Sequence, residues 1–345
     1  MENKPIVSVI IPVKAASEKQ IISCFELLQK QTLRSFEVLV VCDSSEDTKA
    51  NRDFIAKFSM SDSRFRMLIE APGQGLGGAR NLGIESAKSP FIAFVDIDDH
   101  PSFSFLESLI NNQKNNDSDI VICGFARHYP DSHVETWLPP FKENRSGSDC
   151  LGDVLTWKIN NTLWNKLFKR GLFTDIQFPV ACGGEDFAIL PWIFLKASRV
   201  SSLQETLYEY CIIPTSRSHA LTDFDYYCSF LFLKKRYCLS LSIQKPEIVQ
   251  KCLKEACGVS SRACLFAYAH PQVTGEQRKR EIDDFIYQYK KLVRSSHAGK
   301  KATLVSMTRF YFYPIFLLWS SLQKKKTKTA EKRYQIFEDW WLTHE

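Results

Sequence analysis

Short apolar runs alternate with helix-like patterns over the first 125 residues of the chain. Runs rich in β-branched and aromatic residues predict buried strands over residues 6–13, 36–42, 65–69, 91–95 and 119–125. Between them, apolar residues recur every three or four positions and predict helices over residues 17–30, 47–58, 78–87 and 103–113. This alternation predicts an α/β fold in which helices cover both faces of a largely parallel sheet.

The pattern changes in the second half of the chain. Residues 126–150 contain Pro130, Pro139 and Pro140 and predict an irregular excursion, whereas residues 206–213 predict a further strand. From about residue 223 the periodicity is helical. We therefore expect an α/β catalytic domain over residues 1–222 and a helical region over residues 223–345.

Charge is divided unevenly between these two parts. The net charge of +6 combines 22 Lys and Arg against 10 Asp and Glu in residues 226–345 with 23 against 29 in the remainder. A basic region behind a mildly acidic domain favours an anionic partner, either a membrane surface or a nucleic acid, or is a solvated basic helical face. No nucleic-acid-binding module is recognisable, so nucleic acid is not an expected partner.

Cysteine spacing and the amino terminus bear on the compartment. The eleven cysteines contain no CxxC pair and predict buried thiols in a reducing environment rather than disulfides or a zinc site. The chain enters a strand soon after Pro5, without a signal-peptide pattern. We therefore expect a cytoplasmic protein, either free or bound peripherally to the inner face of the cytoplasmic membrane.

One uncharged, aromatic-rich run lies in the helical region. Residues 310–322 form thirteen uncharged positions followed closely by the cluster Lys324-Lys325-Lys326. A spanning helix needs about 20 apolar residues, so this run is too short to cross a bilayer. It fits a contact with an anionic membrane surface or, equally, a helix packed in a protein core.

Polar features follow three of the predicted strands. They are Asp43, the glycine-rich loop over residues 73–78, and the run Asp96-Ile97-Asp98-Asp99. Ligands bind at the carboxyl ends of the strands in sheets of this kind. Carboxylates that crowd where a strand leaves the core repel one another, and a divalent cation would relieve that repulsion. A polar turn that caps the next helix is the simpler alternative.

Taken in order, seven pieces of the chain resemble the family 2 inverting glycosyltransferases, which have the nucleotide-sugar-binding GT-A fold. The pieces lie at residues 7–13, 31–38, 41–47, 78–84, 96–99, 164–168 and 184–187. The resemblance covers roughly residues 5–220. It implies a mixed, Rossmann-like sheet and transfer from a nucleotide sugar, most often UDP-linked, to a saccharide or lipid-linked saccharide acceptor in cell-surface polysaccharide or lipopolysaccharide synthesis.

The resemblance also implies roles for the donor side. Pro12, Asp43 and Arg80 would serve the nucleotide, and Asp96 would lie near the ribose or orient its turn. Asp98 and Asp99 would hold Mg²⁺ or Mn²⁺, which absorbs the charge that builds on the leaving diphosphate. An arginine at a helix start needs an anionic partner, which could be the acid run or the diphosphate.

The acceptor side follows from the same resemblance. Asp186 would be the base that deprotonates the acceptor hydroxyl, with Glu185 contacting the acceptor or orienting Asp186. Trp164 and Lys166 would contact the acceptor or the donor sugar, although Trp164 could equally be a core residue. His219 could approach the metal or the phosphate, but a lone histidine is more often a polar surface residue.

The chain departs from the family pattern at two positions. Cys42 replaces the first of two acids, and Lys14 stands where an aromatic residue often follows the first strand. Two other functions remain open from the sequence. Gly73, Gly75 and Gly78 fit a dinucleotide-binding pattern, although two strands precede it. The fold could also belong to a catalytically inactive binding protein.

Overall fold

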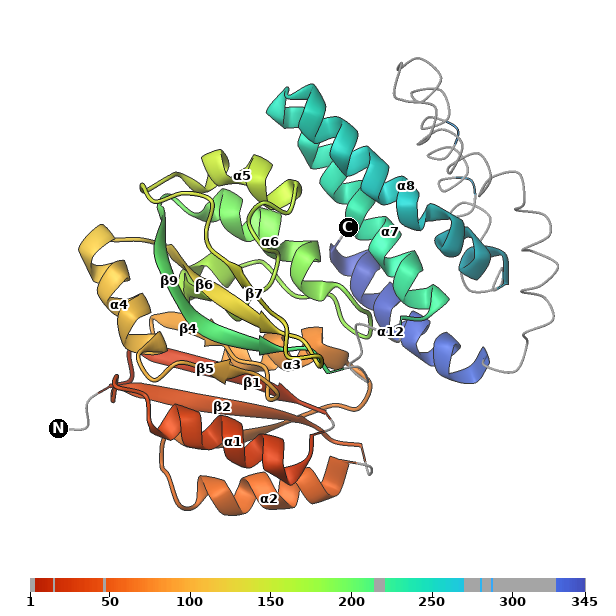
Figure 1. Ribbon diagram of the computed structural model, residues 1–345. Coiled ribbons are helices and arrows are strands. Elements are labelled where there is room, and N and C mark those ends of the chain that lie inside the picture. The colour runs from red at the N-terminus through yellow and green to blue at the C-terminus, as the bar shows by residue number, and fades with distance from the viewer. Residues whose placement is uncertain are drawn as a thin grey trace. The chain divides into compact units, whose positions relative to one another are not determined.

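The computed structural model describes residues 4–14, 16–45, 48–213, 221–269, 280, 287 and 327–344 (Figure 1). By its internal contacts the chain divides into two units: Met1–Ala181 with Glu185–His219, and Cys182–Gly184 with Ala220–Glu345. The expected boundary between a catalytic domain and a helical region at residue 222 stays a prediction. Each unit is described by itself below.

The described part of the first unit contains one sheet of nine strands and six α-helices. Its strands are β1 (Val7–Val13), β2 (Phe36–Asp43), β3 (Phe65–Glu70), β4 (Phe91–Phe94), β5 (His100–Pro101), β6 (Ile120–His128), β7 (Val134–Trp137), β8 (Lys166–Lys169) and β9 (Val200–Cys211). Its helices are α1 (Glu18–Gln29), α2 (Lys49–Ser59), α3 (Gly75–Ser86), α4 (Phe105–Asn116), α5 (Gly147–Leu155), the 3₁₀ turn η2 (Arg170–Phe173) and α6 (Glu185–Lys196).

The sheet is mixed. Its strands lie in the order β3-β2-β1-β4-β8-β6-β9-β5, and β7 pairs with β6. The first four strands in this order are parallel to one another. β8 then pairs antiparallel with both β4 and β6, and β6 pairs parallel with β9. The predicted α/β class and mixed sheet are confirmed, and the parallel pairs are those within β3-β2-β1-β4 and the separate pair of β6 with β9.

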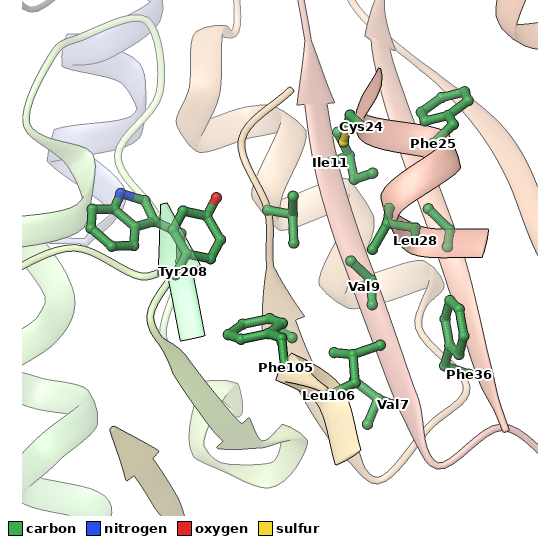
Figure 2. Close-up of a cluster of buried hydrophobic side chains, with 14 of the residues drawn as sticks. Val7, Val9, Ile11, Cys24, Phe25, Leu28, Phe36, Phe105, Leu106 and Tyr208 are labelled. Carbon is green, nitrogen blue, oxygen red and sulfur yellow. The ribbon is translucent and has the colours of Figure 1, made fainter. Parts of the chain in front are cut away.

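The two faces of β1 pack against different helices. Val9 and Ile11 share a buried cluster with Phe25 and Leu28 of α1, and Figure 2 shows these side chains facing one another. On the opposite face, Gly83 of α3 lies so close to Ile10 that a Cβ there would overlap its side chain. Alternate residues of a strand point to opposite faces, so the uniformly apolar run of β1 is explained by burial on both sides.

Two predictions for residues 126–150 and for α3 were wrong in detail. β6 continues to His128 and pairs antiparallel with β7, so the expected irregular excursion begins with a hairpin. The exposed side chains of Val134, Glu135 and Thr136 leave no apolar run that would have revealed β7. α3 begins at Gly75 rather than at residue 78, because its first turn is built from the glycine loop.

The second unit is helical over its described residues, as the periodicity predicted. It contains α7 (Asp223–Ser240), the 3₁₀ turn η4 (Leu241–Ile243), α8 (Pro246–Ala269) and α12 (Thr327–His344). Buried aromatic rings of Phe224, Phe266 and Phe337 join these three helices. Within the residues described, the structure contains no helix that is long and apolar enough to cross a bilayer.

Candidate active site

The parallel strands bring four polar positions to one edge of the sheet. β1, β2, β3 and β4 run in the same direction, so their carboxyl ends lie together. Asp43 ends β2 and Glu70 ends β3, and the two residues are register partners. Asp96 follows the end of β4 by two residues, and Lys14 follows β1 directly. The edge that the sequence predicted as the ligand site therefore carries three acids and one lysine.

Asp43 is buried and well supplied with donors. Its Oδ1 accepts hydrogen bonds from the backbone N of Ser45, at 2.8 Å, and from the Ser45 hydroxyl, while the backbone N of Gly73 lies 3.5 Å from Oδ2. Burial alone would raise the pKa of Asp43, but these hydrogen bonds and the charge of Lys14 outweigh it and hold the pKa below its ordinary value. Asp43 therefore stays ionised at neutral pH and keeps acceptor capacity on Oδ2.

The three acids that follow β4 have different surroundings. Asp99 is fully buried, and its Oδ2 and Oδ1 accept hydrogen bonds of 3.0 Å each from the Tyr208 hydroxyl and the Cys211 backbone N. Asp96 and Asp98 are only partly buried. Burial raises the pKa of both Asp98 and Asp99, and the neighbouring acids add to this rise at Asp99. Asp99 thus already accepts two hydrogen bonds from the protein, and the predicted metal-binding roles of Asp98 and Asp99 stay predictions that the structure does not test.

A metal at this turn would take few ligands from the protein. Among the described side chains, no group of three or more His, Cys, Asp or Glu residues converges on a common point that could hold a metal. Mg²⁺ often needs only one or two carboxylates, because waters and substrate phosphates supply its other ligands. The donor set at Asp96 and Asp98 fits that kind of ion.

Arg80 forms ion pairs with Asp96 of the acid run and with Glu185, the residue directly before the predicted base Asp186. The guanidinium lies in α3, nearly fully buried, with Nη1 2.5 Å from Glu185 Oε1 and Nη2 3.8 Å from Asp96 Oδ1. The rings of Phe94 and Phe178 lie within 6 Å of it. The sequence predicted either the acid run or the diphosphate as the anionic partner of Arg80. The structure shows a pair with Asp96 of the acid run and a further pair with Glu185.

Asp186 lies in the first turn of α6, beside this pair. Its Oδ1 accepts a 2.7 Å hydrogen bond from the backbone N of Phe187. Burial and the charge of Glu185 raise the pKa of Asp186 to about 7, although Arg80 opposes the rise. A carboxyl that titrates near neutral pH can accept a proton from a hydroxyl more readily than an ordinary aspartate.

Trp164 and Lys166 are both buried. Trp164 stacks on Tyr208 and Tyr210, with ring centroids 4.7 and 5.4 Å away. The Nζ of Lys166 donates hydrogen bonds of 2.6–2.8 Å to the carbonyl oxygens of Asn160 and Thr162 and to the side chain of Asn165. Burial lowers the pKa of Lys166 to about 7, and the three oxygens hold its amino group inside the protein. A direct sugar contact by Trp164 or Lys166 stays a prediction that the structure does not test.

Of the remaining predicted positions, the structure describes Pro12. Pro12 is buried in β1 and pairs in register with Val41, beside the strand that carries Asp43. His219, residues 46–47 and residues 310–322 lie outside the described part of the chain.

Glu70 is the site residue that the sequence analysis missed. It is 6% exposed, and burial together with the charge of Asp43 raises its pKa to about 8, which Lys14 only partly offsets. The sequence did contain a signal for Glu70. Charged residues are rarely buried, and this glutamate ends a predicted strand directly before the glycine-rich loop.

Comparisons with known proteins find similarity to glycosyltransferases. EpsH of Bacillus subtilis strain 168, which is named as a glycosyltransferase, is 29% identical over 60% of this chain and 61% of its own length. The uncharacterized glycosyltransferase EpsJ of the same organism is 32% identical over 64% of each chain. This chain therefore spans less than two thirds of either relative.

A solved structure extends the likeness to the fold of nearly the whole chain. Staphylococcus aureus TarS 1–349, in complex with UDP-GlcNAc, superposes with a TM-score of 0.58 over 98% of this chain and 92% of that one, at 20% identity. The family model described as glycosyl transferase family 2 matches residues 8–183, just over half of the chain. By this match, the chain belongs to glycosyl transferase family 2.

Proposed function

We propose that this protein transfers a sugar from a UDP-sugar to a saccharide or lipid-linked saccharide acceptor, with inversion at the anomeric carbon. The reaction would serve the synthesis of a cell-surface polysaccharide or lipopolysaccharide. The observation that carries the proposal is the position of Arg80 between Asp96 and Glu185. One buried cation thereby joins the donor-side acids to the helix turn that carries Asp186.

The donor side would hold the nucleoside diphosphate at the edge of the sheet. Asp43 offers an ionised acceptor for the base, and Asp98, with Asp96 beside it, offers carboxylates to Mg²⁺ or Mn²⁺. The bound ion would act as a Lewis acid that neutralises charge on the leaving diphosphate. Arg80 holds Asp96 and Glu185 in place, because a buried guanidinium fixes the carboxylates that it pairs with.

Asp186 would act as the general base on the acceptor side. It removes the proton of the attacking hydroxyl while that oxygen approaches the anomeric carbon from the face opposite the diphosphate, which inverts the configuration. Glu185 cannot share this role while it pairs with Arg80. It acts instead on the pKa of Asp186, as a neighbouring negative charge.

A peripheral membrane contact through the basic helical region is a further part of the proposal. It is motivated by the uncharged run 310–322 beside the lysine cluster 324–326. Sedimentation of the full-length protein with anionic vesicles, compared with uncharged vesicles, tests it. Equal recovery with both vesicle types would rule out the electrostatic contact.

The central experiment separates catalysis from donor binding. Wild type, Asp186→Asn, Asp98→Ala and the surface control Asp53→Asn are compared for UDP binding by calorimetry, with and without Mn²⁺, and for transfer from a panel of UDP-sugars. Asp186→Asn should lower kcat by about 10²- to 10⁴-fold, the usual contribution of a general base, with donor affinity nearly unchanged. Asp98→Ala should lose the Mn²⁺-dependent part of UDP binding.

Two outcomes would contradict the proposal. Transfer by Asp186→Asn at the wild-type rate would remove Asp186 from catalysis. Absence of nucleoside diphosphate binding by the wild type would favour an inactive binding protein.

A further inference from the structure

Glu70 is a buried acid for which the proposed reaction has no use. It lies beside Asp43 as its register partner on the neighbouring parallel strand, so the two side chains project from the same face of the sheet. Its Oε1 is buried and accepts no hydrogen bond among the described groups. A buried polar atom without a hydrogen-bond partner destabilises the protein, so a ligand group that supplied the missing partner would be favoured at this edge.

The first turn of α3 is shaped around this carboxyl. A Cβ on Gly78 would overlap both Glu70 Oε1 and the Cβ of Gln74, so a larger residue there would have to displace the acid and shift Gln74. Gly78 is the fourth residue of α3, where glycine is less favourable for a helix than alanine. The absence of a side chain at Gly78 therefore leaves space for the carboxyl group of Glu70.

Two adjacent carboxyls at this edge differ in protonation. Asp43 receives the Ser45 and Gly73 hydrogen bonds and is ionised. Burial and the Asp43 charge raise the pKa of Glu70 to about 8, and the charge of Lys14 offsets this rise only in part. At neutral pH Asp43 is thus an acceptor, and Glu70 is a neutral acid whose hydroxyl can donate.

We infer that Glu70 is a second base-reading residue of the donor site, whose hydroxyl donates to a carbonyl oxygen of the nucleobase while Asp43 accepts the neighbouring ring N–H. This inference rests on the proposed function, since it assigns a ligand to the same nucleotide site. It names the chemistry recognised: a lactam edge, with N–H beside C=O.

The lactam edge divides the common bases into two groups. Uracil presents N3–H beside O4, and guanine presents N1–H beside O6. Cytosine and adenine instead present an unprotonated ring nitrogen beside an amine, which would set an acceptor against the Asp43 carboxylate. We assign uracil, in keeping with the UDP-sugar proposal, and guanine is distinguished from it by the experiment below.

The donated proton makes nucleotide binding depend on pH. Binding requires Glu70 to be protonated, so affinity is full below its pKa and falls as pH rises through about 8. Between pH 7 and pH 9 the protonated fraction falls from about 0.9 to about 0.1, which predicts about tenfold weaker binding. At pH 8 binding should take up about half a proton.

The test uses full-length wild type, Glu70→Gln, Glu70→Leu and the exposed control Glu26→Gln, titrated calorimetrically with UDP, GDP and CDP in the presence of Mg²⁺. Titrations at pH 7 and 9 give the affinities, and two buffers of different ionisation enthalpy at pH 8 give the proton uptake. Glu70→Gln keeps a donor that cannot dissociate, so its UDP affinity should vary little with pH and its proton uptake should vanish. Any remaining pH dependence measures dissociation of the uracil N–H itself.

Each outcome separates this inference from the proposed function. Wild-type affinity for UDP that falls about tenfold by pH 9, with Glu70→Leu about tenfold weaker already at pH 7, supports Glu70 as a base reader. GDP preferred over UDP with the same pH profile also supports the lactam reading but contradicts a uridine donor. UDP binding that is equal at both pH values, or tighter binding of CDP, overturns the inference and leaves the transferase intact. Absence of binding by all three nucleotides at pH 7 overturns both.

Discussion

At the scale of single residues, the pH dependence of transfer should report the pKa of Asp186. The base must be ionised to accept a proton, and its pKa is raised to about 7 by burial and by Glu185. With the UDP-sugar donor saturating, we expect kcat/KM for the acceptor to rise about tenfold per pH unit below pH 7 and to level off above it. Glu185→Gln removes a negative neighbour, so the rising limb should move to lower pH. Glu26→Gln, on the exposed face of α1, is the control.

The pH profile of Glu185→Gln tests whether the pKa of Asp186 sets the rising limb. An unmoved limb would mean that another group sets the profile, and a wild-type limb near pH 4 would mean that Asp186 has an ordinary aspartate pKa.

Residue roles were predictable where they depend on local sequence and unpredictable where they depend on distant segments. Asp43, Asp96 and Asp186 follow or begin elements that the sequence marks, and the structure places them at one edge or around Arg80. Asp98 and Asp99 are adjacent in sequence, yet only Asp99 is enclosed. Its two donors come from residues 208 and 211 in β9, more than a hundred positions later. No local pattern could have separated the two acids.

At the scale of elements, α3 depends on close approach to its surroundings. A Cβ on Gly77 would overlap the backbone carbonyl of Pro179, which cannot move as a flexible side chain could. We expect Gly77→Ala to destabilise the first unit by about 1–3 kcal/mol in denaturant unfolding, as overpacking usually does. It should also weaken UDP binding, because α3 carries Arg80.

Gly258→Ala in α8 is the matched control for this substitution. Gly258 is exposed, and a Cβ there meets nothing within 4 Å. The gain in helix propensity should therefore stabilise the protein by up to about 1 kcal/mol. Destabilisation of equal size by both substitutions would show that close packing at Gly77 is not the cause.

The elements themselves were predictable in proportion to their local signal. β1 to β4 alternate with helices and have long apolar runs, so periodicity located them within a few residues. β8 has four residues, two of them lysines, and is held by pairing with β4 and β6 on either side. Its insertion converts a parallel sheet into a mixed one. That change is specified by long-range pairing, which periodicity cannot reveal.

At the scale of the whole molecule, the chain segment before the proposed base belongs to the helical unit. Cys182–Gly184 groups with Ala220–Glu345, whereas Glu185 and Asp186 belong to the first unit. A Cβ on Gly183 would lie 3.3 Å from Asp225 Oδ1. Covalent continuity through Gly184 therefore connects the packing of the helical unit to the first turn of α6.

Asp225 is the residue through which this connection can be tested. It is nearly fully buried in α7, forms a capping box with Thr222, and pairs with Arg333 of α12 at 2.6 Å. Burial alone would raise its pKa, but the hydrogen bonds of Thr222 and the charge of Arg333 lower it below the ordinary value. Its stabilising contribution is therefore complete above the unfolded-state pKa of about 3.9 and is lost as pH falls through the lower folded value.

Asp225→Asn should reduce the free energy of unfolding of the helical unit by about 3 kcal/mol at pH 7, the usual cost of breaking a buried ion pair. Tryptophan fluorescence in guanidinium can follow this, because α12 contains Trp340 and Trp341. The difference from wild type should shrink under acid conditions, where Asp225 is itself protonated. Asp53→Asn, which breaks an exposed pair with Lys49, should change stability by less than about 0.5 kcal/mol.

The same substitution should affect catalysis and donor binding unequally. The residues proposed to bind the nucleotide and its metal ion, Asp43 and Asp98, belong to the first unit, so UDP affinity of Asp225→Asn should stay within about twofold of wild type. The turn that carries Asp186 begins directly after the segment packed near Asp225, and a small misplacement of a catalytic group can cost about 10²-fold in rate. We therefore expect kcat to fall well beyond any change in UDP affinity. Equal losses in both would mean that Asp225 supports the whole protein rather than the base, and an unchanged kcat would show that Cys182–Gly184 does not transmit the change.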